Sequence, residues 1–203
     1  MNKEKNISDS DLVWEEIRTK HIIQNEWIDF RESAYRFPDG TVFEPYYNYS
    51  RRDYVVVVAT DENDDYICVR QFRQGIKQVT NEFVAGGIER CDGKEYGSDR
   101  TETSAENALE AAKRELREET GYESDEWNHL ITVPSNATIA DNYAHVFRAR
   151  NCKRISGQDL DDTEFINVIK YSGDELRELI EEGKFQQAIH IMGYYCDINA
   201  SGS

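Results

Sequence analysis

The sequence lacks any apolar run close to the roughly 20 residues that a membrane-spanning helix requires. Residues 1–12 are polar and charged, so we expect no secretory signal and a cytoplasmic protein. Proline is scarce, with three among 203 residues, which excludes a proline-rich linker protein. Because 38% of the residues are apolar and 11% are aromatic, the chain can bury a core. One globular domain with at most a small appendage is therefore expected.

Positive charge is scarce as well. The 24 Lys and Arg stand against 40 Asp and Glu, which gives a formal net charge of −16. Such a chain repels nucleic acid and anionic membranes unless it carries a basic patch, and the sequence shows none. We therefore expect neither nucleic acid nor a membrane among its partners. The acidic excess also fits a protein that binds divalent cations, although solubility alone explains most such compositions.

Paired cysteines are absent too. Cys68, Cys91, Cys152 and Cys196 are widely separated, and no two of them form a Cys-x-x-Cys pair. The four histidines lie near none of them at the spacing of zinc ligands. A disulfide framework and a structural zinc site are thus disfavoured, and we expect reduced thiols with a structural role.

Hydrophobic alternation and β-branched runs predict strands along much of the chain. Pro38-Asp39-Gly40 is a turn signal inside the first strand region. Residues 1–14 are expected to form a loose end or a short helix. The expected strands lie within 22–49 and at 54–59, 66–72, 79–85, 129–133, 143–150 and 165–171.

Three helices are expected. The clearest is 104–120, where small and apolar residues recur at helical spacing and Gly121 is the expected C-cap. Ser172 and Glu175 have the spacing of a capping box and predict a helix from there to Glu182. Residues 184–196 form the last expected helix. Strands before and after one central helix predict an α/β (α+β) fold with a mixed sheet sandwiched between helices.

Three glutamates share one face of the central helix. Glu115 lies three residues before Glu118 and four before Glu119, beside the apolar position Leu116. Like charges at these spacings cost roughly 0.2–0.5 kcal/mol per pair, and negative charge near a helix C-terminus is also unfavourable. A local conflict of this kind is typical of a functional site, and Mg²⁺ prefers carboxylate oxygens. By spacing alone, a solvated acidic helix face explains the pattern equally well.

Residues Glu106 to Tyr122 resemble the Nudix box. That box runs Gly, five residues, Glu, seven residues, then Arg-Glu-apolar-x-Glu-Glu-x-Gly-apolar. The chain has Glu106 and, after seven residues, Arg114-Glu115-Leu116-Arg117-Glu118-Glu119-Thr120-Gly121-Tyr122, which matches at every specified position. The resemblance implies the Nudix α/β/α sandwich with a mixed central sheet.

The glycine half of the box departs from the pattern. Eighteen residues, 88–105, separate Gly87 from Glu106 instead of five. We interpret 90–103 as a loop that contains an insertion of about thirteen residues, since extra length is tolerated in loops. Strict counting instead places Arg100 at the glycine position. The pattern therefore does not determine the geometry of this loop, but the match over the expected metal-binding helix is unaffected.

Further segments resemble the ADP-ribose pyrophosphatase branch of this superfamily. They are residues 35–40, 54–59, 69–73, 81–87 and 181–185. In that branch an N-terminal β-region precedes the Nudix domain and helps to form a homodimer. The resemblance therefore implies a dimerising β-region over residues 1–50 and a Nudix hydrolase domain over 51–200, with the inserted loop at 90–103.

The resemblance implies hydrolysis of the diphosphate bond of ADP-ribose or a related nucleoside diphosphate sugar. The products would be a nucleoside monophosphate and a sugar phosphate, and the cofactor Mg²⁺, with Mn²⁺ as an alternative. Metal ions suit this reaction because they neutralise phosphate oxygens and activate a water. By the resemblance, the metal-binding and catalytic carboxylates are Glu115, Glu118 and Glu119.

The resemblance also assigns supporting roles. The Ala85 carbonyl adds a metal ligand, and Glu106 supports or bridges the metal, although its spacing from Thr103 also fits a capping box. Arg114 orients the carboxylates, with a simple surface salt bridge as the alternative. Arg73 matches an arginine near the diphosphate, and Glu82 is a further substrate-binding candidate. Each of these two has a structural role as its alternative.

The general base is expected on the acidic loop before residue 165, outside the box. Glu164 is the first choice and Asp162 the second, with a solvated acidic turn as the alternative. The aromatic candidates for stacking on an adenine are Tyr46, Tyr47 and Phe30, which core packing explains as well.

Residues 134–142 depart from the Ser-Pro-Gly-containing loop of the branch, so other nucleoside diphosphate derivatives remain alternative substrates. A non-catalytic nucleotide sensor on the same fold is a second alternative. Such proteins usually lose carboxylates of the box, whereas this chain keeps all four. An acidic interaction protein with an accidental match is the third.

Overall fold

The computed structural model describes residues 8–89 and 107–201, and these fall into two compact units. The first unit takes in residues 8–51 and 136–141. The second takes in residues 52–89, 107–135 and 142–201. Cys91, Glu106 and the expected loop at 90–103 lie outside the described residues.

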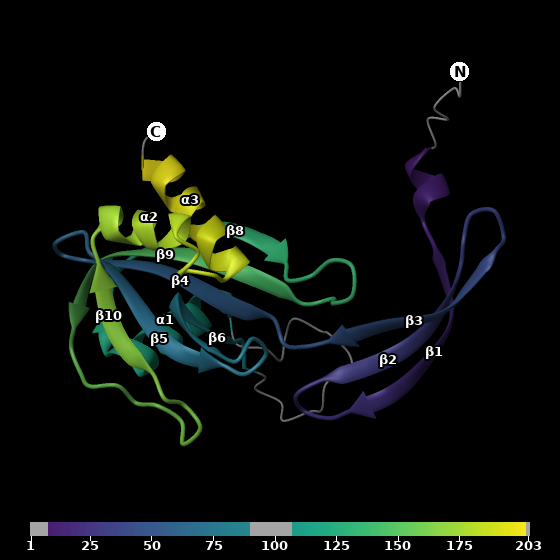
Figure 1. Cartoon of the computed structure of the whole chain (residues 1–203), viewed down its shortest axis with the longest axis horizontal. Coiled ribbons are helices and arrows are strands. Elements are labelled where there is room, and N and C mark those ends of the chain that lie inside the picture. Colours follow the sequence, from purple (N-terminus) through teal and green to yellow (C-terminus); the bar gives the residue numbers. More distant parts are fainter. Residues whose placement is uncertain (1–7, 90–106, 202–203) are drawn as a thin grey trace. The chain divides into compact units, whose positions relative to one another are not determined.

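The first unit is built on a three-stranded antiparallel sheet in the order β1-β2-β3 (Figure 1). A short 3-10 helix, η1 (Asp9–Leu12), precedes β1 (Glu15–Gln24), β2 (Asp29–Arg36) and β3 (Val42–Ser50). The predicted turn after β2 is confirmed, since Gly40 adopts a φ of 87° and its N–H donates to the Phe37 carbonyl at 2.9 Å. The expected start of the strands at residue 22 was too late. Nearly every residue of β1 is exposed, so the strand lacks the buried alternation by which a sequence reveals it.

Aromatic side chains cluster on the first unit. Trp14 packs against Phe37 with ring centroids 4.5 Å apart and meets Tyr35 edge-on at 6.0 Å. Tyr46 lies 5.5 Å from Tyr35 in the same edge-on arrangement. Phe43 completes the group, which we call the aromatic cluster of the first unit. Such edge-to-face contacts are the favoured geometry for aromatic rings.

The second unit contains a seven-stranded mixed sheet. Its path runs β10-β5-β6-β4-β9-β7, with β8 paired to β9. The pair β4–β9 is parallel, and the other pairs are antiparallel. The strands are β4 (Tyr54–Asp61), β5 (Tyr66–Arg73), β6 (Gln78–Gly87), β7 (Tyr122–Glu123), β8 (Glu126–Pro134), β9 (Tyr143–Arg154) and β10 (Asn167–Tyr171).

Helices cover both faces of this sheet (Figure 1). They are α1 (Ala108–Thr120), α2 (Gly173–Glu181) and α3 (Ala188–Ser201). Successive side chains of a strand point to opposite faces of the sheet, so β4 contributes residues to a hydrophobic core on each face. Val55 and Val57 pack with α1, whereas Val56 and Val58 pack with residues of α2 and α3. The expected sandwich with a mixed central sheet is therefore confirmed.

The helix α1 begins later than the sequence predicted. Asn107 is its N-cap, with an extended backbone (φ −66°, ψ 137°) and a side chain that accepts from the Leu109 N–H at 2.9 Å. Asparagine is a favoured N-cap because its side-chain oxygen satisfies an unpaired N–H. The predicted C-cap is confirmed: Gly121 has a φ of 76°, and a Cβ there would lie 2.3 Å from the Ser156 carbonyl oxygen. Only glycine fits at this position.

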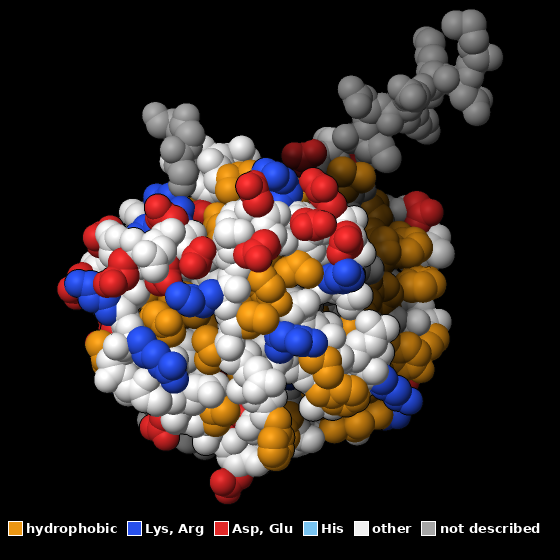
Figure 2. Space-filling model, turned by 60° about the vertical axis from the view of Figure 1, so that its left-hand side comes forward, with side chains coloured by type: hydrophobic (Ala, Val, Ile, Leu, Met, Phe, Trp, Pro, Cys, Tyr) orange, Lys and Arg blue, Asp and Glu red, His pale blue; other side chains and the backbone are white. Residues whose placement is uncertain are grey.

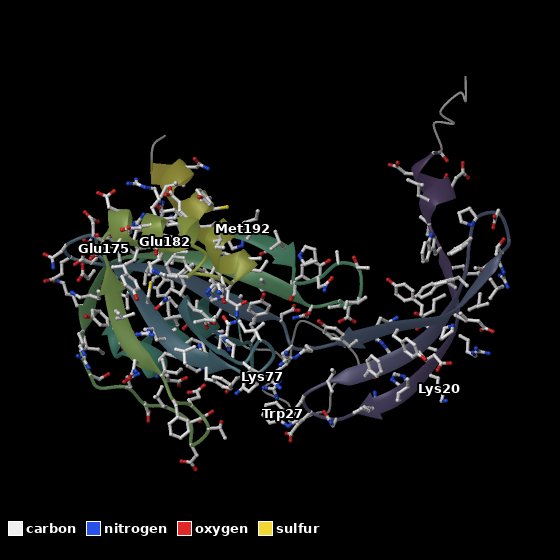
Figure 3. All side chains as sticks on the ribbon, viewed as in Figure 1. Lys20, Trp27, Lys77, Glu175, Glu182 and Met192 are labelled. Carbon is white, nitrogen blue, oxygen red and sulfur yellow. The ribbon has the colours of Figure 1, made fainter. Side chains whose placement is uncertain are left out.

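The predicted capping box at the start of α2 is also confirmed. The Glu175 carboxylate accepts a hydrogen bond from the Ser172 N–H, and α2 ends at Glu181 with Glu182 as its C-cap (Figure 3). The last helix starts at Ala188 rather than at residue 184, and β10 starts at Asn167 rather than at residue 165. Phe185 lies in the link between α2 and α3 and is fully buried. It is apolar because the link packs into the core, and not because it belongs to the apolar face of a helix.

In the part of the chain that the structure describes, no helix combines the length and apolar character needed to cross a bilayer. Acidic side chains are interspersed with Lys and Arg over the face shown in Figure 2. Free cysteines among the described residues are Cys68, Cys152 and Cys196, and the first two are buried. Their burial agrees with the expected structural role of these thiols.

Candidate active site

The helix α1 presents Glu115, Glu118 and Glu119, which we call the α1 carboxylates. Glu115 is 8% exposed and Glu119 is 3% exposed. Leu116 between them is fully buried in the core that α1 shares with the sheet. Glu115 and Glu119 are buried because they lie next to this apolar face of the helix. The Glu118 side chain keeps 31% exposure. The helical spacing thus produces two buried carboxylates and one at the margin.

The end of β6 lies directly against these carboxylates. A Cβ built on Gly86 would lie 2.0 Å from the Glu115 Cδ, so the carboxylate occupies the space that any side chain would fill. The next residue back, Ala85, donates its backbone N–H to the Glu119 carboxylate. Sequence reasoning placed Ala85 at the site through its carbonyl and gave Gly86 no role. The doubled glycine after Ala85 was the available signal, since close backbone approach favours glycine.

Arg114 ties two of the carboxylates together. Its Nη1 donates to Glu115 Oε1 at 2.8 Å and to Glu118 Oε2 at 2.9 Å. Its Nη2 donates to the Gly87 carbonyl at 3.0 Å. The guanidinium therefore fixes both carboxylates relative to the end of β6, which is the geometry an orienting arginine requires.

The charge of the cluster is not balanced by these contacts. Burial raises the pKa of Glu115 to about 7, and the charges of Glu118 and Glu164 act in the same direction. Burial, together with the charges of Glu115 and Glu164, raises the pKa of Glu119 well above its ordinary value. The Glu119 Oε2 atom is buried and accepts no hydrogen bond from the described residues. A buried oxygen of this kind is costly unless a partner binds it.

The acidic loop is anchored to the C-terminal end of α1. The Gln158 amide donates to the Glu119 carbonyl at 2.8 Å and to the Ile166 carbonyl at 3.1 Å, and the Asp159 N–H donates to the Glu118 carbonyl at 2.9 Å. These donors satisfy helix-end carbonyls that have no partner within α1. Sequence reasoning missed Gln158, and an amide side chain within an acidic loop was its signal.

Of the two candidate bases, the structure brings Glu164 to the α1 carboxylates. Its charge contributes to the raised pKa of both Glu115 and Glu119. The Glu164 Oε2 also accepts from the Asp161 N–H at 3.2 Å, which restrains the side chain. Asp162 is exposed, and it is not among the groups with the largest effects on those two pKa values.

Arg73 forms a bidentate pair with Glu82. Its Nε lies 2.9 Å from Glu82 Oε1 and 3.0 Å from Oε2, and its Nη2 bonds Oε2 as well. Burial alone would raise the pKa of Glu82, but hydrogen bonds from Arg73 and Thr80 hold it below its usual range. Glu82 is fully buried, whereas the Arg73 side chain keeps 33% exposure and its charge acts on Glu119. Arg73 is therefore held by Glu82, and its charge acts on Glu119 of the α1 carboxylates.

The donor set suits a hard divalent cation. Among the described residues, no three His, Cys, Asp or Glu side chains already converge on a metal position. The site nevertheless offers carboxylate oxygens, one of them buried and unpaired, in a cluster whose negative charges repel one another. Mg²⁺ binds through one or two carboxylates and keeps several waters, so it needs no closed protein cage. Glu106, a further expected ligand, lies outside the described residues.

The candidate adenine-stacking residues all belong to the first unit. Phe30 and Tyr47 stack on each other with centroids 5.8 Å apart and planes at 11°. Tyr46 belongs to the aromatic cluster of that unit and donates its hydroxyl to the Thr138 carbonyl at 2.5 Å. Each of the three rings thus has a packing role within its own unit.

Comparison with known proteins identifies the family of the chain. The family model described as NUDIX domain matches residues 50–190. The chain is 27% identical over 174 residues to a methanol dehydrogenase activator of Bacillus methanolicus, covering 82% of each chain. It is 27% identical over 135 residues to an ADP-ribose pyrophosphatase of Bacillus subtilis, covering 66% of this chain and 65% of that protein.

A solved structure shows the same fold. The crystal structure of an ADP compounds hydrolase superposes with a TM-score of 0.74 at 17% sequence identity, covering 95% of this chain and 96% of that one. The family match spans more than half of the chain and includes every described member of the site. The chain belongs to the NUDIX domain family and, over about two thirds of its length, is similar to an ADP-ribose pyrophosphatase.

Proposed function

We propose that this Nudix pyrophosphatase hydrolyses the diphosphate bond of ADP-ribose or a related nucleoside diphosphate sugar, with Mg²⁺ as its cofactor and Mn²⁺ as the alternative. The observation that carries the proposal is the pair of buried carboxylates, Glu115 and Glu119, whose pKa values stay raised despite the nearby charges of Arg114 and Arg73, together with the unpaired Glu119 Oε2. The similarity to an ADP-ribose pyrophosphatase supports the choice of substrate.

The α1 carboxylates would hold the cation, assisted by the Ala85 carbonyl and by Glu106. When bound, the cation neutralises the diphosphate oxygens and activates a water. Arg114 keeps Glu115 and Glu118 in place through its two hydrogen bonds. Arg73, held by Glu82, would bind the diphosphate through the exposed part of its guanidinium.

Glu164 is the proposed general base. Its carboxylate is restrained by the Asp161 N–H and lies close enough to influence both buried glutamates. A base in this place can take the proton of an attacking water at its own oxygen. We expect Glu164→Gln to lower kcat by about a hundredfold while leaving KM within about twofold. Asp162→Asn is the matched control, and the opposite ranking would make Asp162 the base.

We further propose a cytoplasmic homodimer that forms through the β-region of residues 1–50. The support is the aromatic cluster of the first unit, where Trp14 is 46% exposed and Phe43 is 43% exposed. Exposed apolar patches are typical of interaction surfaces. Light scattering after gel filtration should give twice the chain mass of 23.6 kDa, and Trp14→Ala should shift it toward the single-chain mass.

The reaction is tested by incubating the protein with Mg²⁺ and ADP-ribose, ADP-glucose, GDP-mannose, NADH and a dinucleoside polyphosphate, with products identified by mass. We expect AMP and ribose 5-phosphate from ADP-ribose and no turnover after chelation of the metal. Turnover of another compound would retain the mechanism and change the substrate. Absence of turnover on every compound, with Mg²⁺ bound, would overturn the proposal in favour of a nucleotide sensor.

A further inference from the structure

The segment of residues 184–190, which links α2 to α3 and begins α3, is fixed to three consecutive residues of β6. The Asn81 amide donates to the Lys184 carbonyl at 3.0 Å. The Gln187 amide donates to Glu82 Oε1 at 3.1 Å, and the Phe83 N–H donates to His190 Nδ1 at 3.0 Å. Because the three contacts follow one another along the strand, the position of Gln187 is set from both sides.

Near Phe83, β6 is not paired with β4, so this segment can contact the edge of β6 there. β4 pairs with β6 over Tyr54 to Val57 and then with β5 at Ala59 and Thr60, so its pairing with β6 stops before Phe83 is reached. A buried backbone N–H needs an acceptor, and here the imidazole of His190 provides it. Phe185, fully buried, packs edge-on against the Phe83 ring with centroids 5.1 Å apart. The link is therefore part of the core of the second unit.

Glu82 transmits this fixed position to Arg73. Its Oε1 accepts from the Thr80 hydroxyl and the Gln187 amide, and both of its oxygens accept from Arg73. Two neutral donors thus set the rotation of a carboxylate that has no exposed surface. Since the guanidinium is planar and bonds in a fixed fork, the plane of the carboxylate determines the direction of the arginine.

We propose that Gln187, together with Thr80, positions Arg73 for the diphosphate of the substrate by holding Glu82. This inference rests on the proposed function, in which Arg73 binds the diphosphate. Gln187 and Thr80 are positioning residues, because both act on Glu82 and through it on Arg73. The segment that begins α3 is thereby part of the substrate-binding machinery.

The direct test is a double-mutant cycle between Gln187→Ala and Arg73→Ala, assayed by steady-state kinetics on ADP-ribose with Mg²⁺. In the otherwise unchanged protein, Gln187→Ala should raise KM about fivefold and leave kcat within about twofold, as expected for lost binding. In the Arg73→Ala background it should change KM by less than about twofold, because the residue it positions is gone. Gln186→Ala, at the exposed neighbouring glutamine, is the matched control. An unchanged KM, or an equal loss in both backgrounds, would overturn the inference.

A second pair of variants separates positioning from packing. Thr80→Val keeps the shape and removes the hydroxyl, whereas Thr80→Ser keeps the hydroxyl. We expect Val to raise KM and Ser to restore it, and equal effects of the two would contradict a role for the hydroxyl.

A third readout needs no turnover. Nuclear magnetic resonance of the Arg73 Nε–H should show lost protection from solvent exchange in Gln187→Ala and unchanged protection in Gln186→Ala. An inactive wild-type protein would overturn the proposed function, while unchanged Arg73 protection would overturn this inference by itself.

Discussion

Two regions of the second unit bury glutamates to a similar degree and stabilise them in opposite ways. Glu82 is fully buried and accepts hydrogen bonds from an arginine, a threonine and a glutamine. Burial alone would raise its pKa, but the hydrogen bonds from Arg73 and Thr80 hold it below the usual range. Glu119 is 3% exposed, and its pKa rises because burial and neighbouring carboxylates outweigh its one backbone donor. The protein supplies the counter-charge and the hydrogen-bond donors that the Glu82 carboxylate needs. The Glu119 carboxylate requires a partner that the chain does not supply.

The comparison separates structural from functional acidic residues on physical grounds. A buried charge is tolerated when its hydrogen-bonding capacity is met, and Glu82 meets that condition. The α1 carboxylates do not, since Glu119 Oε2 is buried without a hydrogen bond from the described residues. Repulsion between neighbouring carboxylates is expected at a site that binds a cation, because the bound positive charge offsets it.

The largest expected effect is on catalysis by the unbalanced cluster. Glu119→Gln should reduce kcat/KM by at least about a thousandfold, roughly 4 kcal/mol, because it removes a metal-binding charge. In the absence of metal the same variant should unfold at the same temperature as the wild type or higher, since a repelled carboxylate is gone. Glu110→Gln, at an exposed glutamate of the same helix, is the control. A large loss of metal-free stability in Glu119→Gln would show instead that the protein itself stabilises the Glu119 carboxylate, as it does that of Glu82.

The next effect concerns His190, which lies in the region of Glu82. Burial lowers its pKa to about 4, so the folded protein keeps it neutral while the unfolded chain takes up a proton below about pH 6.5. The free energy of unfolding should therefore fall by roughly 3 kcal/mol as the pH drops from 6.5 to 4, as far as this group is concerned. Urea titrations over that range should show a smaller fall in His190→Gln, and the wild-type fall in the exposed-site control His129→Gln.

A matched substitution in the balanced region should have the opposite sign to Glu119→Gln. Glu82→Gln leaves the Arg73 charge without its counter-charge and should lower the free energy of unfolding by about 2 kcal/mol. This loss is smaller than the roughly 3–5 kcal/mol for breaking a fully buried pair, because Arg73 keeps 33% exposure and can be hydrated. Urea unfolding without metal measures both variants, and equal effects would erase the distinction between the two regions.

The smallest expected effect on stability comes from Gly86→Ala. The new methyl group would push the end of the Glu115 side chain away from its Arg114 partner, so the free energy of unfolding should fall by about 1 kcal/mol, the contribution of one hydrogen bond. Displacing that carboxylate should lower kcat/KM by about tenfold or more. Gly75→Ala is the control, because a Cβ there meets nothing within 4 Å. Unchanged activity in Gly86→Ala would show that the place of the Glu115 carboxylate is unimportant.

Local patterns in the sequence predicted the framework of the site. The spacing of Glu115, Glu118 and Glu119 placed them on one helical face, and Gly121 and the Ser172 capping box marked helix ends correctly. These features depend on neighbours within a turn or two. The exposed strand β1 was only partly predicted, because neither of its faces has the burial that creates an alternating pattern.

Contacts between distant segments could not be predicted in this way. Glu82 and Gln187 are 105 positions apart, and Gln158 reaches a carbonyl 39 positions away. No periodicity links such pairs, and they became visible only once the sheet and helices were assembled. Gly86 is intermediate, since the glycine was visible in the sequence but its reason, the Glu115 carboxylate, was not.

We propose that a divalent cation binds the α1 carboxylates and offsets their repulsion. The most direct measurement is the unfolding temperature of wild type, Glu119→Gln and Glu110→Gln as Mg²⁺ is added without substrate. A ligand that binds the folded state at about a hundred times its Kd stabilises it by about 2.7 kcal/mol. If the cation binds there, the unfolding temperature should rise to saturation in wild type and Glu110→Gln and should not rise in Glu119→Gln. The same rise in all three proteins, or no rise in the wild type, would contradict the proposal.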